Sequence, residues 1–363
     1  MKHVHAEHGI ICRLPGERFS YFGWPSVARL DDGTLLAASS GLRSAHVCPW
    51  GKTVLHVSRD NGRTWSPSRV IQDSPIDDRD AGIITLGGSR VLVSWFRSDT
   101  RRYRDANWLS DAERTSWTAV LSHWTDEMVH GLLGSWVMLS DNAGASWGAP
   151  ISVPVSSPHG PIQLANGHLL YLGKDFQTQH DTNRTRHIQA ARSEDGGRTW
   201  EVIGTVPEHP GHDPALYHEP HAVALPSGRL VGMIRISGTD AAGFNHFSML
   251  QTISDDGGLT WTPARPLGFH GSPPHLLCHS SGVLVLTYGY RLAPYGQRVA
   301  FSHDDGATWE HDWILRDDGP DGDLGYPGTV EMADGSLFSV YYQKAASGEK
   351  CSLLWSRWEM PRV

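Results

Sequence analysis

Six segments of the chain share one pattern of apolar and polar positions, in which two apolar or alternating runs of β-forming residues flank a tight turn that contains glycine. Such runs on either side of a glycine turn are typical of β-hairpins. We therefore predict a hairpin in each segment. The six segments cover residues 27–37, 83–95, 162–173, 222–234, 276–289 and 329–342.

A polar turn that ends in tryptophan also repeats along the chain. The sequence SRDNGRTW at 58–65 returns in close variants at 140–147, 193–200, 254–261 and 302–309. Asp and Ser side chains of such a turn accept hydrogen bonds from nearby backbone N–H groups, the glycine adopts a positive φ, and the tryptophan packs beneath. We expect these aspartates to hold the turn rather than to take part in chemistry. The tryptophans are expected to be buried in equivalent places, at Trp65, Trp147, Trp200, Trp261 and Trp309.

The order of these elements predicts the fold. Each hairpin is followed by a third β-rich run and, in five cases, by the tryptophan turn and a fourth short run. Four antiparallel strands repeated six times predict an all-β fold, a six-bladed β-propeller that forms a single domain over residues 1–363. The last blade lacks a fourth strand, and we expect the N-terminal run HVHAEHGIICRL to supply it and close the ring. An insertion at about 98–134 separates the second and third strands of blade 2.

The composition narrows the possible partners. With 31 Lys and Arg against 39 Asp and Glu, the chain has a formal net charge of −8, which argues against a nucleic-acid partner. No apolar stretch is long enough to span a bilayer, and the first residues lack the apolar core of a signal peptide, so we expect a cytoplasmic protein unless a leader was removed. The four cysteines show no CxxC spacing, and neither a zinc site, a disulfide framework nor a cofactor is predicted.

Propeller topology places the candidate chemistry on one face, where the first strands begin and the second strands end, because the hairpins and tryptophan turns share the other face. Five of the six second strands end on a cation. These cations are Arg43, Arg97, Lys174, Arg235 and Arg291. Guanidinium groups bind carboxylates through two hydrogen bonds, so a ring of them predicts an anionic ligand. The alternative is that they pair with Asp78, Asp80 or Glu219.

The tryptophan turns, in phase with six hairpins, make the whole chain similar to the sialidase (neuraminidase) superfamily and its Asp-box propellers. The segment HEPHAVALPSGRLVGMIR resembles the family segment with a catalytic glutamate and an arginine, which implies those roles for Glu219 and Arg235. The segment GDLGYPG implies Tyr326 as the nucleophile, and Arg291, rather than Arg298, as another arm of the arginine triad. The resemblance implies an exo-acting glycoside hydrolase for a terminal anionic or sialic-acid-like sugar.

Two of the family's residues are missing. Gly23, in the sequence GWP, stands where the family has its first arginine, and the sequence SAHVCPWGK has no carboxylate where the family has its acid/base aspartate. The loss of one charged contact predicts that an ordinary sialoside is a poor substrate, unless Arg43 or Arg97 replaces the missing arm. Asp80 resembles a different family aspartate, one that contacts substrate.

The residues that remain suggest how a reaction proceeds. A tyrosine hydroxyl has an ordinary pKa near 10, and Glu219 can take the proton of Tyr326 as the tyrosine attacks. A general acid must protonate the leaving oxygen, and the candidates are His46, Asp78 and Asp80.

Other residues on this face are candidates for sugar binding. We expect Trp24 to form a stacking floor beneath the sugar, and His159, His221 and His275 to form hydrogen bonds with its hydroxyl groups. A metal site is not predicted, because His218 and His221 point to opposite sides of an extended segment and no helical HExxH motif is present.

Two other classes of function stay open. A polysaccharide lyase would use the arginines to neutralise a uronate carboxylate while histidine and tyrosine side chains transfer protons. A non-catalytic carbohydrate-binding propeller would use the same cations without chemistry. The sequence identifies neither the sugar nor the oligomeric state.

Overall fold

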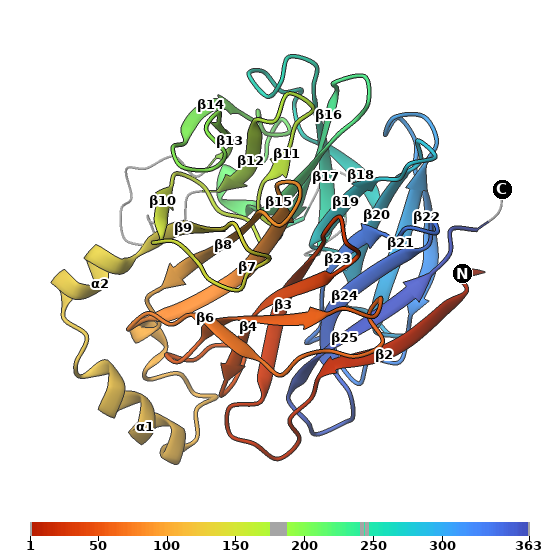
Figure 1. Ribbon diagram of the computed structural model, residues 1–363. Coiled ribbons are helices and arrows are strands. Elements are labelled where there is room, and N and C mark those ends of the chain that lie inside the picture. Colours follow the sequence, from red (N-terminus) through yellow and green to blue (C-terminus); the bar gives the residue numbers. More distant parts are fainter. Residues whose placement is uncertain (1, 175–186, 240–242, 244–246, 362–363) are drawn as a thin grey trace.

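The computed structural model describes residues 2–174, 187–239, 243 and 247–361. In this part of the chain the strands form six sheets, each built on four antiparallel strands, which confirms the predicted six-bladed β-propeller. The blades follow one another in chain order around the molecule (Figure 1). The fold therefore gathers the first strands of all six blades around one axis.

The blades have the following strands. Blades 1 to 3 comprise β3 Tyr21–Arg29, β4 Leu35–Arg43, β5 Lys52–Ser58 and β6 Arg69–Gln72; β7 Asp77–Thr85, β8 Val91–Ser98, β9 Gly134–Ser140 and β10 Ile151–Val153; β11 Ile162–Gln163, β12 Leu169–Lys174, β13 Ile188–Ser193 and β14 Glu201–Thr205. Blades 4 to 6 comprise β15 Tyr217–Ala224, β16 Leu230–Ile236, β17 Ser248–Ser254 and β18 Arg265–His270; β19 Pro274–Cys278, β20 Leu284–Tyr290, β21 Gly296–Ser302 and β22 Glu310–Arg316; β23 Gly325–Glu331, β24 Leu337–Lys344, β25 Cys351–Trp358 and β2 Ala6–Cys12.

The N-terminal segment closes the ring as predicted. Strand β2 pairs antiparallel with β25, with Ala6 opposite Trp358, and becomes the outer strand of blade 6. A second contact was not predicted: β1 (Lys2–His3) pairs parallel with β22 and adds a fifth strand to blade 5. The two ends of the chain accordingly lie on the same side of the molecule in Figure 1.

Apolar clusters between neighbouring blades hold the ring together. Each of the six pairs of adjacent blades encloses one cluster of buried side chains. Between blades 1 and 2, for example, Leu36 and Leu55 pack with Val93 and Trp95. The cores consist mainly of Val, Leu, Ile and aromatic side chains because the flat faces of two sheets must be filled.

The repeated polar turns fasten each blade to the preceding one. In the first turn, the Asp60 carboxylate accepts hydrogen bonds from Thr64 Oγ1 at 2.6 Å and Thr64 N at 2.9 Å, and these bonds lower the pKa of Asp60 to about 2. A Cβ atom at Gly62, whose φ is +86°, would collide with the ring of Phe338 in blade 6. The turn thus needs glycine both for its φ and for the close approach to the preceding blade.

The five tryptophans of these turns are less buried than predicted. Trp261 is buried, whereas the other four are half-buried. The indole N–H of Trp65 donates to the carbonyl of Gly62 in its own turn, at 3.0 Å, and equivalent bonds hold Trp200 and Trp261. These bonds fix the ring at the edge of a blade, where one side of it stays in contact with solvent.

The insertion in blade 2 folds into helices that were not predicted. Between β8 and β9 lie a short 3₁₀ turn, Arg101–Tyr103, and two α-helices, α1 (Asp111–Leu121) and α2 (Asp126–Leu132). Ser110 and Glu113 form a capping box at the start of α1. Figure 1 shows both helices at the outer edge of the propeller, away from the chain ends. Among the described residues, no helix has the length and apolar character needed to cross a membrane.

Candidate active site

Four residues near the start of the inner strands have backbone conformations that L-residues rarely adopt. Their φ angles are 51° for Trp24, 53° for Asp80, 47° for Glu219 and 53° for Tyr326. Each lies at a register shift between the first and second strands of its blade. A positive φ costs a non-glycine residue about 1–3 kcal/mol and is found where the surrounding structure imposes it, often at functional sites. These bulges redirect four side chains, and two of them meet across the ring.

Tyr326, Glu219 and Arg235 form a hydrogen-bonded cluster. The Tyr326 hydroxyl donates to Glu219 Oε1 at 2.6 Å, and Arg235 Nη1 donates to Glu219 Oε2 at 2.5 Å and to the Tyr326 hydroxyl at 3.3 Å. Tyr326 comes from blade 6, whereas Glu219 and Arg235 come from β15 and β16 of blade 4. The structure thus brings together three residues that the family resemblance selected.

The protonation states of this cluster suit proton transfer from tyrosine to glutamate. Burial works to raise the pKa of Glu219, but the charge of Arg235 and the hydrogen bond from Tyr326 outweigh it and leave this pKa below its ordinary value. Burial, and then the negative charge of Glu219, raise the pKa of Tyr326 well above 10. At neutral pH the tyrosine is therefore protonated, and the carboxylate that accepts its hydrogen bond is ionised.

Arg291 lies beside this cluster. Its guanidinium carbon is 5.8 Å from the centre of the Tyr326 ring, and Nη2 donates to the carbonyl of Leu324 at 2.7 Å. The ring of Phe247 lies near both Arg291 and Arg235, at 4.4 and 4.9 Å from their guanidinium carbons. Arg298, the less favoured candidate, is buried and donates to backbone carbonyls, among them that of Pro294.

Arg43 and Arg97 do not belong to this cluster, which corrects the expectation that they receive a ligand. Arg43 is fully buried and donates to both carboxylate oxygens of Asp77, at 2.6 and 2.9 Å. Arg97 pairs with the buried Asp78 at 3.4 Å. Both guanidinium groups are thus engaged inside the protein, and neither can replace the missing arm without breaking a buried ion pair. Lys174 likewise donates to backbone carbonyls.

Trp24 cannot act as a stacking floor, because its side chain is covered. Only 1% of Trp24 is exposed, and the guanidinium carbons of Arg79 and Arg43 lie 4.3 and 5.0 Å from the centre of its ring. The sequence interpretation overlooked Arg79, although it immediately precedes the bulge residue Asp80. Its side chain is 13% exposed, lies 3.6 Å from the carboxylate of the buried Asp77, and brings a guanidinium next to Trp24, the neighbour of Gly23. Arg79 thus adds a third cation to Arg235 and Arg291, and it lies near Gly23, the position at which the family's first arginine is missing.

Asp80 and Asp78 differ in their surroundings, although both are buried. Asp80 is 5% exposed, and its Oδ1 has no hydrogen-bond partner among the described residues. Burial chiefly raises the pKa of Asp80 to about 7, with a contribution from the charge of Glu219 and against that of Arg79. Asp78 is fully enclosed and accepts a hydrogen bond from Ser74 N at 2.7 Å. Asp80 thus keeps one carboxylate oxygen without a partner among the described residues, and its contact with a substrate stays a prediction, whereas Asp78 stabilises the local fold.

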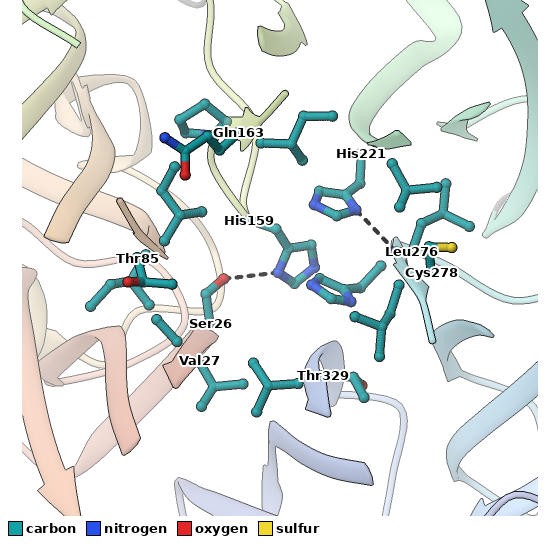
Figure 2. A pocket seen from close by; sticks show the side chains of 18 of the residues that line it. Ser26, Val27, Thr85, His159, Gln163, His221, Leu276, Cys278 and Thr329 are labelled. Carbon is teal, nitrogen blue, oxygen red and sulfur yellow. Dashed lines mark hydrogen bonds between the residues drawn. The ribbon is translucent and has the colours of Figure 1, made fainter. Parts of the chain in front are cut away.

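The three histidines selected from the sequence form a cluster on the axis. The ring of His159 lies 5.5 Å from that of His221 and 4.9 Å from that of His275, and the last two stack at 4.5 Å. Figure 2 shows His159 bonded to Ser26 and His221 bonded to Leu276, through contacts of 2.9 and 3.0 Å at their Nδ1 atoms.

These histidines line a central cavity of about 410 Å³, which Figure 2 shows together with apolar residues of the inner strands. The lining of this cavity does not include Tyr326, Glu219 or Arg235. Binding of sugar hydroxyls by the three histidines therefore stays a prediction. Among the residues that the structure describes, no group of His, Cys, Asp or Glu side chains has an arrangement suited to a metal ion.

A comparison with family models decides the family. Residues 116–339, more than half of the chain, match the model of the BNR repeat-like domain. The chain belongs to the BNR repeat-like domain family. No curated protein matches the sequence significantly.

Solved structures agree with the fold of this BNR propeller. A protein of unknown function from Dyadobacter fermentans superimposes with a TM-score of 0.75, at 22% identity over 98% of both chains. The intramolecular trans-sialidase from Ruminococcus gnavus gives 0.63, at 15% identity over 95% of this chain and 96% of that one. The α-L-arabinofuranosidase from Fusarium graminearum gives 0.63, at 13% identity over 97% and 98%. At these identities the likeness shows a sialidase-like propeller fold.

The histidine cluster predicts how the stability of this BNR propeller depends on pH. Burial holds the pKa values of His159 and His221 well below 6.5 and lowers that of His275 to about 3. The unfolded chain therefore binds these protons more readily, so the stability that His275 contributes is complete above pH 6.5 and is lost toward pH 3. We expect the stability of the wild type relative to His275→Asn to fall by about 1.4 kcal/mol for each pH unit below 6.5.

Urea denaturation of both proteins between pH 7.5 and 4.5 measures this difference, and His123→Asn, at an exposed position of the insertion, serves as the control. A difference that stays constant over this range would contradict the prediction.

Proposed function

We propose that this protein is an exo-acting glycoside hydrolase that removes a terminal anionic sugar, with Tyr326 as the nucleophile and Glu219 as the base that activates it. The observation that carries the proposal is the 2.6 Å hydrogen bond from the Tyr326 hydroxyl to the Glu219 carboxylate, which Arg235 holds in place. Two bulges of the inner strands aim these side chains at each other across the ring. Strained positions of this kind are frequent where a site is preorganised, and here two of them bring a tyrosine and a glutamate into contact.

The reaction follows from this geometry in two steps. In the first, the oxygen of Tyr326 forms a bond to the anomeric carbon, its proton passes to Glu219, and the glycosidic oxygen leaves with a proton from a general acid. In the second, water attacks the anomeric carbon and gives a proton to the conjugate base of that general acid, while Tyr326 leaves and recovers its proton from Glu219. A neutral tyrosine has an advantage over a bare carboxylate here, because it does not repel a negatively charged sugar.

Two features support an anionic substrate. Arg79, Arg235 and Arg291 contribute three guanidinium groups around Tyr326 and Trp24. In addition, Arg235 Nε is buried and has no hydrogen-bond partner among the described residues. A buried cationic donor that lacks an acceptor is costly, and a ligand carboxylate would supply the acceptor.

A panel of aryl glycosides tests the proposed function and separates it from the alternatives. The wild type is incubated with an aryl α-sialoside, an aryl β-glucuronide and the neutral aryl α-L-arabinofuranoside, and release of the aryl group is measured. We expect release from an anionic member and little from the neutral one. Ultraviolet absorbance of an unsaturated uronate, formed from a uronate-containing polysaccharide, would show a lyase instead. Binding without any product would show a carbohydrate-binding propeller.

Arg79 provides a prediction about affinity for the anionic sugar. A hydrogen bond to a charged group contributes roughly 1.5–3 kcal/mol. Replacing Arg79 with glutamine should therefore raise KM for the anionic glycoside about 10- to 100-fold, with a smaller effect on kcat. Arg102→Gln is the matched control, because Arg102 is an exposed arginine of the insertion. Equal KM values for Arg79→Gln and Arg102→Gln would show that Arg79 does not bind the substrate.

A further inference from the structure

His46 occupies a defined position in the segment that lacks the family's aspartate. It lies in the loop between β4 and β5, and its Nδ1 is 3.0 Å from Asp323 Oδ1 and 2.8 Å from the hydroxyl of Tyr21. Tyr21 also donates to the same oxygen of Asp323, at 2.9 Å. Asp323 comes from the segment that immediately precedes β23 and Tyr326. Two other segments of the chain, at Tyr21 and at Asp323, thus converge on one nitrogen of the imidazole.

This arrangement leaves the other nitrogen available. Because Nδ1 faces Asp323 and Tyr21, Nε2 points away from them, and it has no hydrogen-bond partner among the residues described. The His46 side chain is 48% exposed. Its ring packs edge-on against the Trp24 ring, with 4.9 Å between the ring centres. The Trp24 ring also packs edge-on against the Tyr326 ring, with 6.3 Å between the centres. An imidazole whose Nδ1 is held by a carboxylate and whose Nε2 is accessible has the geometry of a general acid and base.

The helical insertion supports the loop that carries His46. Cys48, two residues after His46, is buried in one apolar cluster with Trp117 and Leu121 of α1, and Trp50 contacts Trp117 at 6.4 Å. Precise proton transfer requires a donor that is held in place. The insertion thus gives the loop the rigid backing that a catalytic role demands.

We propose that the Asp323–His46 pair protonates the leaving oxygen in the first step and deprotonates water in the second; this rests on the function proposed above. As Tyr326 bonds to the anomeric carbon and gives its proton to Glu219, the bond to the leaving oxygen breaks and that oxygen takes the proton from Nε2. In the second step Nε2 accepts a proton from the attacking water, and Glu219 returns its proton to the departing Tyr326. Both histidine and glutamate are regenerated.

Asp80, the other candidate, is less suited to this task. It is almost fully buried, and it interacts electrostatically with Arg79 and Glu219 and, more weakly, with Arg43 and Asp77. In an exo-acting enzyme the leaving group extends toward solvent. His46 is half-exposed and is therefore better suited than Asp80 to reach the leaving group. Asp80 remains available to donate a hydrogen bond to the retained sugar.

The charged groups around His46 determine the expected pH profile. The partial burial of the His46 ring lowers its pKa below 6.5; Asp323 acts in the opposite direction, and the positive charges of Arg79 and Arg43 lower this pKa further. The acid form of His46 therefore predominates only at a pH below 6.5, so kcat/KM should fall as the pH rises through this lowered pKa. Replacing Asp323 with asparagine removes the influence that raises this pKa and should shift the fall to a lower pH.

Two glycosides of the sugar that the panel identifies test the pair. A 4-nitrophenyl group leaves as a stable anion and needs little help from an acid, whereas a methyl group needs a proton. In His46→Gln, kcat/KM should fall by less than about tenfold for the 4-nitrophenyl glycoside and by about 10²–10⁴ for the methyl glycoside. Asp323→Asn should show a smaller loss on the methyl glycoside together with the shifted pH profile. His130→Gln, at an exposed position of α2, is the matched control.

The outcomes separate the two proposals. Equal losses on both glycosides in His46→Gln, or no loss on either, would overturn the role of the pair while the proposed function stands. An unshifted pH profile in Asp323→Asn would overturn the part assigned to Asp323. If the wild type cleaves neither glycoside, the proposed function fails and the role of the pair fails with it.

Discussion

Replacing Tyr326 with phenylalanine is expected to lower kcat/KM on the cleaved glycoside by at least ~10⁴-fold, because the nucleophilic oxygen is lost while the ring remains. Removing the hydroxyl leaves the Glu219 carboxylate with Arg235 as a partner, so the loss of stability should be limited to about 1–3 kcal/mol. Steady-state kinetics and thermal denaturation of the same preparation distinguish loss of chemistry from loss of folding.

A companion variant tests the partner of the tyrosine. Glu219→Gln keeps the shape of the side chain but removes the proton acceptor, and kcat/KM should fall by about 10²–10⁴-fold. Tyr342→Phe is the matched control: Tyr342 is a buried tyrosine next to Tyr326, at 5.9 Å between ring centres, without a role in the proposed reaction. If Tyr326→Phe retains more than a tenth of wild-type activity, or if Tyr342→Phe loses as much as Tyr326→Phe, Tyr326 is not the nucleophile.

The largest effect on stability is expected at the buried ion pair between Arg43 and Asp77. Both side chains are fully buried, and Asp77 accepts hydrogen bonds from both terminal nitrogens of Arg43. Replacing Asp77 with alanine leaves the buried guanidinium of Arg43 without its counter-ion and also removes the 3.6 Å contact of Asp77 with Arg79; breaking such a buried pair costs about 3–5 kcal/mol. We expect the free energy of unfolding, measured by urea denaturation, to decrease by this amount.

An exposed ion pair in the same blade provides the control. Lys52 and Asp73 form a contact in which half of the Asp73 side chain is exposed. Such pairs contribute about 0–1 kcal/mol, so Asp73→Ala should change the free energy of unfolding by less than about 1 kcal/mol. Similar losses in Asp77→Ala and Asp73→Ala would show that the buried ion pair of Arg43 contributes no more to the free energy of unfolding than an exposed one. In that case its exclusion from ligand binding would lose its main support.

The blades could be predicted from sequence because their signals are local and repeated. A glycine turn between two apolar runs specifies a hairpin through neighbouring residues alone, and its recurrence six times fixes the architecture. The helices of the insertion also left a signal that was overlooked. Ser110 and Glu113 have the spacing of a capping box, and Trp117, Leu121 and Trp124 recur on one helical face.

The candidate site was predictable only in part, because several of its contacts depend on neighbouring blades. Arg43 and Arg235 end equivalent strands and look alike in the sequence. They differ in the structure because Asp77, at the start of β7, encloses the guanidinium of Arg43, whereas Arg235 meets Glu219. Asp323 stands among other acidic turn residues, and only the folded chain shows which of them reaches His46. Local patterns carry no information about such contacts.

The bulged positions left a fainter signal. Trp24, Glu219 and Tyr326 each precede a proline, and all three have a positive φ. A residue before proline is restricted in its backbone, so this recurrence could have marked the inner strands as irregular. It would not have shown that Trp24 is covered by Arg79, since that contact joins blades 1 and 2.

The central claim, that Tyr326 attacks a sugar with the help of Glu219, can be tested most directly by trapping the covalent intermediate. The probe is a glycosyl fluoride of the cleaved sugar with a second fluorine next to the anomeric carbon. Fluoride leaves readily, while the second fluorine withdraws electrons and slows hydrolysis of the intermediate. Mass spectrometry of the digested protein should then find the sugar on the peptide that contains Tyr326, and Tyr326→Phe should remain unlabelled. A label on Glu219, or full turnover of the probe without any labelled peptide, would contradict the account.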